Sequence, residues 1–174
     1  GASIIAEDLG VIPDFVRASL TRLGVPGMKV MRWERDWTTE GRPFLDPAAY
    51  PAVSVAISGT HDTETMAEWW DNADAAERAA VLDLPALRDD GFTAGEPYSG
   101  RLRDALLETL YASGSDLLLL PMQDVFGWRD RINTPAVVSD ENWSWQLPWR
   151  VDRLAHQPES TERAAFLTYL SENT

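Results

Sequence analysis

Val53-Ser54-Val55-Ala56-Ile57-Ser58 runs directly into Gly59-Thr60-His61-Asp62, and this stretch decides the fold. Its first part is a short, mostly apolar run that predicts a buried strand. Its second part places a small residue, a hydroxyl, an imidazole and a carboxylate where the strand ends. The apolar segment Ile4-Ile5-Ala6 likewise ends in Glu7-Asp8-Leu9-Gly10. Two strands that deliver carboxylates at their carboxyl ends indicate a barrel-type active site.

Outward from this stretch, strands and helices are expected to alternate. Further strands are expected at 3–6, 28–33 and 116–120, and helices at about 13–23, from Thr65 onward, at about 99–112 and at about 160–171. This order is typical of an α/β parallel sheet with helical crossovers. The run Leu117-Leu118-Leu119-Leu120 predicts a strand covered on both faces. Because about four strands make half of a (β/α)8 barrel, we expect 1–174 to be one domain, a partial barrel without its N-terminal strands.

The composition excludes several classes of function. The formal net charge of −13 argues against nucleic acid and anionic membranes, which both need basic patches. The chain has no cysteine, which excludes disulfides and thiolate metal sites and favours a reducing, cytoplasmic location. Neither His61 nor His156 belongs to a cluster with metal-ligand spacing, and no phosphate-binding motif is present, so we expect neither metal nor cofactor. No apolar run approaches the roughly 18 residues of a membrane span.

Glu7 and Asp62 are the candidate catalytic carboxylates, and each has a plain structural alternative. Glu7 is either a solvated or helix-capping acid beside Asp8, or a general acid whose pKa is raised by partial burial and a nearby carboxylate. Asp62 is either the N-cap of the following helix or, together with His61, a group that binds sugar hydroxyls.

The stretch 121–150 is expected to be a long loop, and such loops in compact domains are usually functional. Trp143 and Trp145 alternate with polar residues there, with Trp128 and Trp149 on either side. Core packing is the default role of tryptophan. Indole rings interleaved with amides and carboxylates also suit a carbohydrate groove, because flat rings stack on sugar faces while polar groups bind hydroxyls.

These motifs together resemble those of the 4-α-glucanotransferases, the amylomaltase or disproportionating-enzyme family. The motifs that carry the resemblance keep their order between about residues 4 and 150: Ile5-Ala6-Glu7-Asp8-Leu9-Gly10, Gly24-Val25-Pro26-Gly27-Met28-Lys29-Val30, Gly59-Thr60-His61-Asp62 followed by Trp69-Trp70, Pro121-Met122-Gln123-Asp124, Arg131-Ile132-Asn133-Thr134-Pro135, and Asn142-Trp143-Ser144-Trp145.

The resemblance implies a (β/α)8 barrel that moves an α-1,4-glucan segment to the 4-hydroxyl of another glucan, with retention through a covalent glycosyl-enzyme. In that family Glu7 would be the general acid/base and Asp62 the transition-state stabiliser. His61 would bind the same sugar, and Gln123 and Asn133 would line the groove.

One part of the family pattern has no counterpart. The family's nucleophile is an aspartate on an earlier strand, in an Arg-x-Asp-His type motif, and Asp130 in the last loop does not substitute for it. We therefore expect the C-terminal half of a barrel, cut at a strand edge and inactive alone. Its expected partners are α-1,4-glucans and either the missing N-terminal half or a second copy. Two alternatives stay open: a non-catalytic glucan-binding half-barrel, and an α-glucan hydrolase of the amylase clan.

Overall fold

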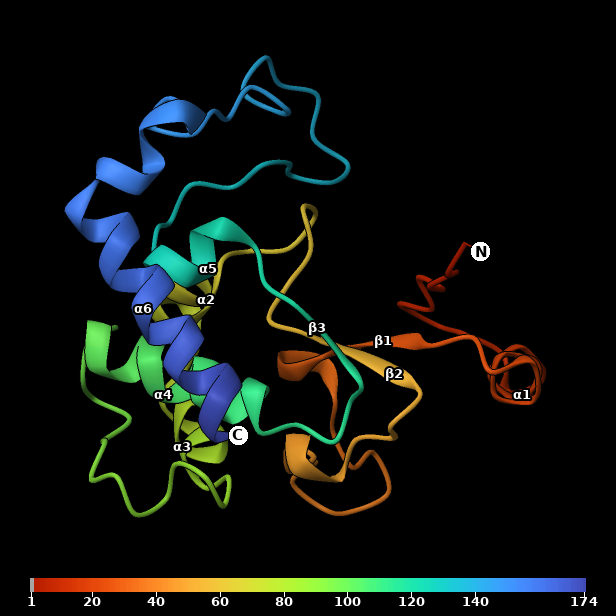
Figure 1. Ribbon diagram of the computed structural model, residues 1–174. Coiled ribbons are helices and arrows are strands. Elements are labelled where there is room, and N and C mark those ends of the chain that lie inside the picture. The colour runs from red at the N-terminus through yellow and green to blue at the C-terminus, as the bar shows by residue number, and fades with distance from the viewer. Residues whose placement is uncertain (1) are drawn as a thin grey trace.

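A small parallel sheet lies beside a group of helices in the computed structural model, which describes residues 2–174 (Figure 1). Its strands are β1 (Gly27–Val30), β2 (Ser54–Ile57) and β3 (Leu117–Leu119), in the order β1-β2-β3. Both pairs are parallel, with Met28 opposite Val55 and Val55 opposite Leu117. The three strands therefore end at the same edge of the sheet. This is the α/β arrangement expected from the sequence.

Two expected strands differ in the structure. The segment 3–6 is not a strand: Ala6 makes only an isolated parallel bridge to Gly27, and its N–H donates to the Pro26 carbonyl at 2.9 Å. The strand expected at 28–33 ends at Val30, where the chain turns into the 3-10 helix η1 (Met31–Trp33). After this turn the Arg32 guanidinium donates a hydrogen bond to the Ser58 carbonyl, where the loop after β2 begins.

The helices follow the expected positions more closely. They are α1 (Asp14–Leu23), α2 (Met66–Asn72), α3 (Ala75–Leu82), α4 (Gly100–Tyr111), α5 (Met122–Phe126) and α6 (Pro158–Asn173), with short 3-10 turns η2 (Pro47–Ala49) and η3 (Val151–His156). Gly24 ends α1 with a φ of +64°, a conformation that glycine adopts without strain. The Thr65 and Ser99 hydroxyls cap α2 and α4.

Two helices were not expected. The sequence predicts one helix after Thr65, but the chain forms both α2 and α3. Asp74 caps the start of α3 by accepting a hydrogen bond from the Glu77 N–H at 2.8 Å. Helix α5 occupies the beginning of the stretch expected to be a long loop. It ends at Gly127, where φ is +77°.

The two faces of the sheet are covered unequally. Ala56 faces the main core, where Trp70 and the leucines of α4 are fully buried. Val55 and Ile57 face the other side, where Leu9 and Met28 cover them. No helix between residues 2 and 174 is long and apolar enough to cross a membrane.

The edge strand β3 is open, which corrects the expectation of a strand covered on both faces. Leu117 and Leu119 are 43% and 50% exposed, and only Leu118 packs against the main core. Helix α1 is also thinly packed, since none of its residues is buried, and it lies at the opposite end of the molecule from α6 (Figure 1).

Candidate active site

The loop between β2 and α2, residues 58–65, carries the first group of candidate side chains. We call it the β2–α2 loop. It is braced internally: the Thr60 N–H donates to the Thr63 hydroxyl at 2.9 Å, and that hydroxyl donates to the Thr60 carbonyl at 3.0 Å. Asp62 is half-exposed within this turn. The N-cap alternative for Asp62 is wrong, because Thr65 caps α2 by accepting a hydrogen bond from the Glu68 N–H at 3.1 Å.

Three sequence-predicted residues meet at this loop. The Asn133 side-chain amide donates to Asp62 Oδ1 at 2.6 Å, and His61 Nε2 lies 3.4 Å from the same oxygen. The Asn133 backbone N–H donates to the His61 carbonyl at 3.1 Å, so backbone and side chain both hold the later loop against the earlier one. A carboxylate, an imidazole and an amide facing the same space can bind vicinal hydroxyls.

Trp143 and Trp145 have different surroundings. The Trp143 ring centroid lies 5.1 Å from that of His61, and its side chain is exposed. Trp145 instead packs against Trp128, with centroids 6.1 Å apart, in an aromatic cluster with Phe126 and Trp149. The Trp143 ring is thus accessible for stacking against a ligand, whereas Trp145 mainly packs against other aromatic rings.

Glu7 stands apart from this group. Its side chain is exposed and makes no hydrogen bond or ion pair within residues 2–174. Its neighbour Asp8 is buried, because its carboxylate accepts a hydrogen bond from the Met28 N–H at 2.8 Å and lies 3.6 Å from Arg17. The described residues therefore do not supply the partial burial expected for Glu7.

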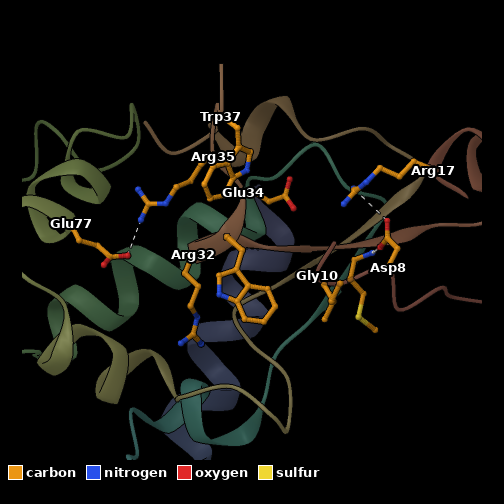
Figure 2. Close-up of a pocket in the computed structure, with 11 residues that line it drawn as sticks. Asp8, Gly10, Arg17, Arg32, Glu34, Arg35, Trp37 and Glu77 are labelled. Atoms are coloured by element: carbon orange, nitrogen blue, oxygen red, sulfur yellow. Dashed lines mark hydrogen bonds and ion pairs between the residues drawn. The ribbon is translucent and has the colours of Figure 1, made fainter. Parts of the chain in front are cut away.

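A cavity of about 690 Å³ begins immediately after Glu7 (Figure 2). Its lining combines aromatic and charged side chains: Asp8, Leu9, Gly10, Arg17, Met28, Arg32, Trp33, Glu34, Arg35, Trp37 and Glu77. In Figure 2 the Asp8–Arg17 pair and the Arg35–Glu77 pair lie on opposite sides, with Arg32 between them.

A second hollow of about 410 Å³ is lined by Asp62 and Arg131, and it shares Arg32, Trp33 and Glu77 with the first. The two hollows adjoin, so a groove leads from the segment after Glu7 to Asp62. Arg32 and Trp33 were not predicted as site residues, because both lie inside the strand expected at 28–33.

Buried polar groups lie beneath the β2–α2 loop. Asp124 is 1% exposed, and burial raises the pKa of its carboxyl above the ordinary range. Burial likewise lowers the pKa of the Arg32 guanidinium. Gln123 is buried beside Asp124, and its Nε2 has no hydrogen-bond partner within residues 2–174. Across the same residues, no group of three or more His, Asp or Glu side chains could hold a metal ion.

The carboxylate, imidazole and indole of this site all lie beyond the carboxyl ends of parallel strands. The chain therefore belongs to the class of α/β proteins whose functional site is formed by the loops at that edge of the sheet. The family model of 4-alpha-glucanotransferase matches residues 1–152, so the chain belongs to this family.

Individual relatives agree with this assignment. The 4-alpha-glucanotransferase of Thermus thermophilus is 38% identical over 170 residues, which are 92% of this chain and 33% of that protein. The enzyme of Chlamydia pneumoniae is 33% identical over 160 residues, 87% of this chain and 29% of that one. The chain therefore spans about a third or less of the length of these relatives.

Solved structures show the same fold. The amylomaltase from Streptococcus agalactiae in complex with acarbose superposes with a TM-score of 0.71 at 31% identity, covering 97% of this chain and 31% of that one. The amylomaltase from Corynebacterium glutamicum gives a TM-score of 0.74 at 19% identity, which speaks for the fold alone.

Proposed function

We propose that these residues form the acid/base and stabiliser side of a retaining 4-α-glucanotransferase site, which transfers α-1,4-glucan segments between maltooligosaccharides. The observation that carries the proposal is the Asp62 carboxylate, held by Asn133 at 2.6 Å beside His61 at one end of a groove. The family membership supports it. The substrate is an α-1,4-glucan, and the reaction needs no cofactor.

Glu7 and Asp62 take different parts in this proposal. Glu7 donates a proton to the leaving glycosidic oxygen and later takes one from the acceptor hydroxyl, as the acid/base of a retaining enzyme does. Asp62 stabilises the positive charge that develops on the sugar ring. Hydrogen bonding to Asn133 keeps the Asp62 carboxylate in one orientation.

Substrate binding falls to the side chains around Asp62. His61 and Asn133 contact sugar hydroxyls, and the exposed ring of Trp143 offers a stacking surface. Trp145 and Gln123 complete the proposed groove. Gln123 is buried, and it lines a small hollow with Thr60, Thr63 and Arg131 beside the proposed groove.

The nucleophile is proposed to come from outside these residues. A retaining enzyme needs a carboxylate about 5–5.5 Å from the acid/base. Glu7 is exposed, and the family's nucleophile motif is not present in the sequence of these residues. We propose that β1–β3 and the bridge at Ala6 belong to the C-terminal half of a (β/α)8 barrel. The open β3 edge then receives the N-terminal half or a second copy.

A second candidate function is a glucan-binding half-barrel without catalysis. The observation that favours it is the combination of an exposed Trp143 ring with the lack of the family's nucleophile motif in these residues. Both candidate functions bind α-1,4-glucans, but only the glucanotransferase converts them to products.

Incubation with maltotriose separates these functions. The full-length gene product should yield glucose together with longer maltooligosaccharides, and Glu7→Gln and Asp62→Asn should abolish this. Glu172→Gln and Asp89→Asn change exposed acids elsewhere and should leave the product pattern intact. Residues 1–174 alone should produce nothing.

Each other product pattern contradicts a part of the proposal. Turnover by residues 1–174 alone would reject an external nucleophile. Glucose and maltose without longer products would indicate the hydrolase. Glucan binding without turnover by the full-length product, unchanged in the Glu7→Gln/Asp62→Asn double variant, would indicate the binding module.

A further inference from the structure

Two buried charged residues hold the β2–α2 loop from below, one from each neighbouring strand exit. We propose that Arg32 and Asp124 are positioning residues that place the Asp62 carboxylate for catalysis. The catalytic part of this inference rests on the proposed function, and it extends the site to side chains that need not touch the substrate.

Asp124 holds both ends of the loop. It lies in the first turn of α5, after β3, and its Oδ2 accepts a hydrogen bond from the Ser58 hydroxyl at 2.5 Å. Its Oδ1 accepts from the Met66 N–H at 2.7 Å. Ser58 is where the loop leaves β2, and Met66 is where α2 begins. One carboxyl group therefore sets the separation between the two ends of the loop.

Arg32 makes the matching contacts from the other side. It lies in η1, after β1, and its Nη2 donates to the Ser58 carbonyl at 3.1 Å and to the Glu64 carbonyl at 2.6 Å. Carbonyls turned toward the interior need such a donor, because an unpaired buried carbonyl costs free energy. The guanidinium thus satisfies the backbone at the start and near the end of the same loop.

At Gly59 the loop backbone lies in close contact with the Arg32 guanidinium. A Cβ atom at Gly59 would lie 2.5 Å from the Thr63 hydroxyl and 2.7 Å from Arg32 Nη2. Only glycine allows the backbone to approach the guanidinium so closely.

This support reaches Asp62 through the backbone. Asp62 lies between the two held ends, and its hydrogen bond to Asn133 and its approach to His61 both require the present loop shape. Catalytic groups misplaced by about 1 Å lose on the order of 100-fold in rate. Arg32 and Asp124 are both buried, and each follows a different neighbour of β2 in the sheet. The position of the loop is therefore fixed relative to the sheet from both sides.

His61 provides a readout that does not depend on glucan chemistry. In NMR spectra of the full-length gene product, the His61 imidazole signal is identified as the one that a His61→Gln variant lacks. The His61 ring lies close to the Asp62 carboxylate and to the Trp143 ring, and its resonances therefore report the geometry of the loop.

The test compares three variants of the full-length gene product. Asp124→Ala removes both contacts at the ends of the loop, and Ser58→Ala removes one of them while keeping the carboxyl group. Asp104→Ala is the matched control, because it removes an acid that pairs with Arg163 at 2.6 Å between α4 and α6 and makes no hydrogen bond to the β2–α2 loop within residues 2–174. Thermal unfolding establishes which variants are folded.

We expect Asp124→Ala and Ser58→Ala to shift the His61 resonances, and Asp104→Ala to leave them in place. With maltotriose, kcat should fall about 10- to 100-fold in Asp124→Ala and less in Ser58→Ala, while KM changes little, since a stabiliser acts in the transition state. If Asp124→Ala does not fold, Ser58→Ala still carries both readouts.

Three results would contradict either the positioning role or the proposed function, and they can be told apart. Unshifted His61 resonances in a folded Asp124→Ala or Ser58→Ala protein would overturn the positioning role. An equal loss of kcat in Asp104→Ala would do the same, because it would trace the loss to general destabilisation. Shifted resonances in a protein whose unmodified form has no turnover would uphold the positioning role and reject the proposed function instead.

Discussion

At the scale of single residues, the site depends on a few close approaches that only certain side chains allow. Gly59 lies against the Arg32 guanidinium, and Asn133 bonds the Asp62 carboxylate directly. Gly27 is similarly constrained, since a Cβ there would lie 2.6 Å from an Asp8 oxygen. Arg32 and Asp8, which these glycines approach, both line the groove, so an added methyl group at either glycine would displace a side chain of the candidate site.

Gly59→Ala should therefore lower the free energy of unfolding by about 1–3 kcal/mol, because the added methyl group overlaps the Thr63 hydroxyl and the guanidinium. Urea denaturation of the 174-residue chain measures this difference. Gly95→Ala is the matched control: a Cβ there meets no atom within 4 Å, and we expect a change of no more than about 0.5 kcal/mol. Equal stabilities of the two variants would contradict the close approach at Gly59.

At the scale of elements, capping residues decide where the helices on either side of the site begin. Thr65 starts α2 four residues after His61, and its hydroxyl accepts a hydrogen bond from the Glu68 N–H at 3.1 Å. The cap leaves the Asp62 carboxylate free, since Asp62 has no part in starting the helix. The cap thus determines both the length of the β2–α2 loop and which of its side chains face the groove.

Thr65→Ala should cost about 1 kcal/mol of stability, the usual effect of losing an N-cap hydroxyl. Thr65→Ser keeps the hydroxyl, and most of the stability should return. The midpoint of urea denaturation distinguishes the two variants. A serine variant as unstable as the alanine variant would assign the loss to the threonine methyl group, which is buried, and would contradict the cap.

Local signals predicted the elements better than they predicted the site. Helix α1 spans Asp14–Leu23, close to the expected 13–23, and α2 begins directly after Thr65, as expected. The break between α2 and α3 also had a local signal, because Asp74 and Glu77 have capping-box spacing.

The site needs contacts that no local pattern contains. Arg32 and Ser58 are 26 positions apart, and Ser58 and Asp124 are 66 apart. In the sequence Arg32 is a charged residue inside the strand expected at 28–33, and Asp124 is part of a family motif. The exposure of β3 was missed for the same reason, since whether a leucine run is covered depends on elements far away in the chain.

At the scale of the whole molecule, one face of the sheet remains partly open. Leu117 and Leu119 stand opposite Val55 and Ile57 in the parallel register, so all four side chains share one face. Leu9 and Met28 cover the β2 part of this face, and the β3 part is exposed. An apolar face at an unpaired strand edge favours association.

The 174-residue chain should therefore self-associate in solution, and Leu119→Lys should shift it toward the monomer by placing a charge on the open face. Sedimentation velocity at several concentrations measures the distribution. Val138→Lys changes an equally apolar but fully exposed loop residue and should leave the distribution unchanged. Identical distributions for both variants and the parent chain would exclude the β3 face as the contact.

The two-sided support of the β2–α2 loop has a consequence for how the protein folds. The hydrogen bonds to Ser58 come from residues 26 positions before it and 66 after it, so they form only after both crossovers have closed. Contacts between residues so distant in sequence are entropically costly and form late. During synthesis, His61 and Asp62 leave the ribosome before α5 does. Until α5 has emerged, Asp124 cannot form its hydrogen bonds to the loop that carries them. We therefore expect the site to form late in folding, after β3 has joined the sheet.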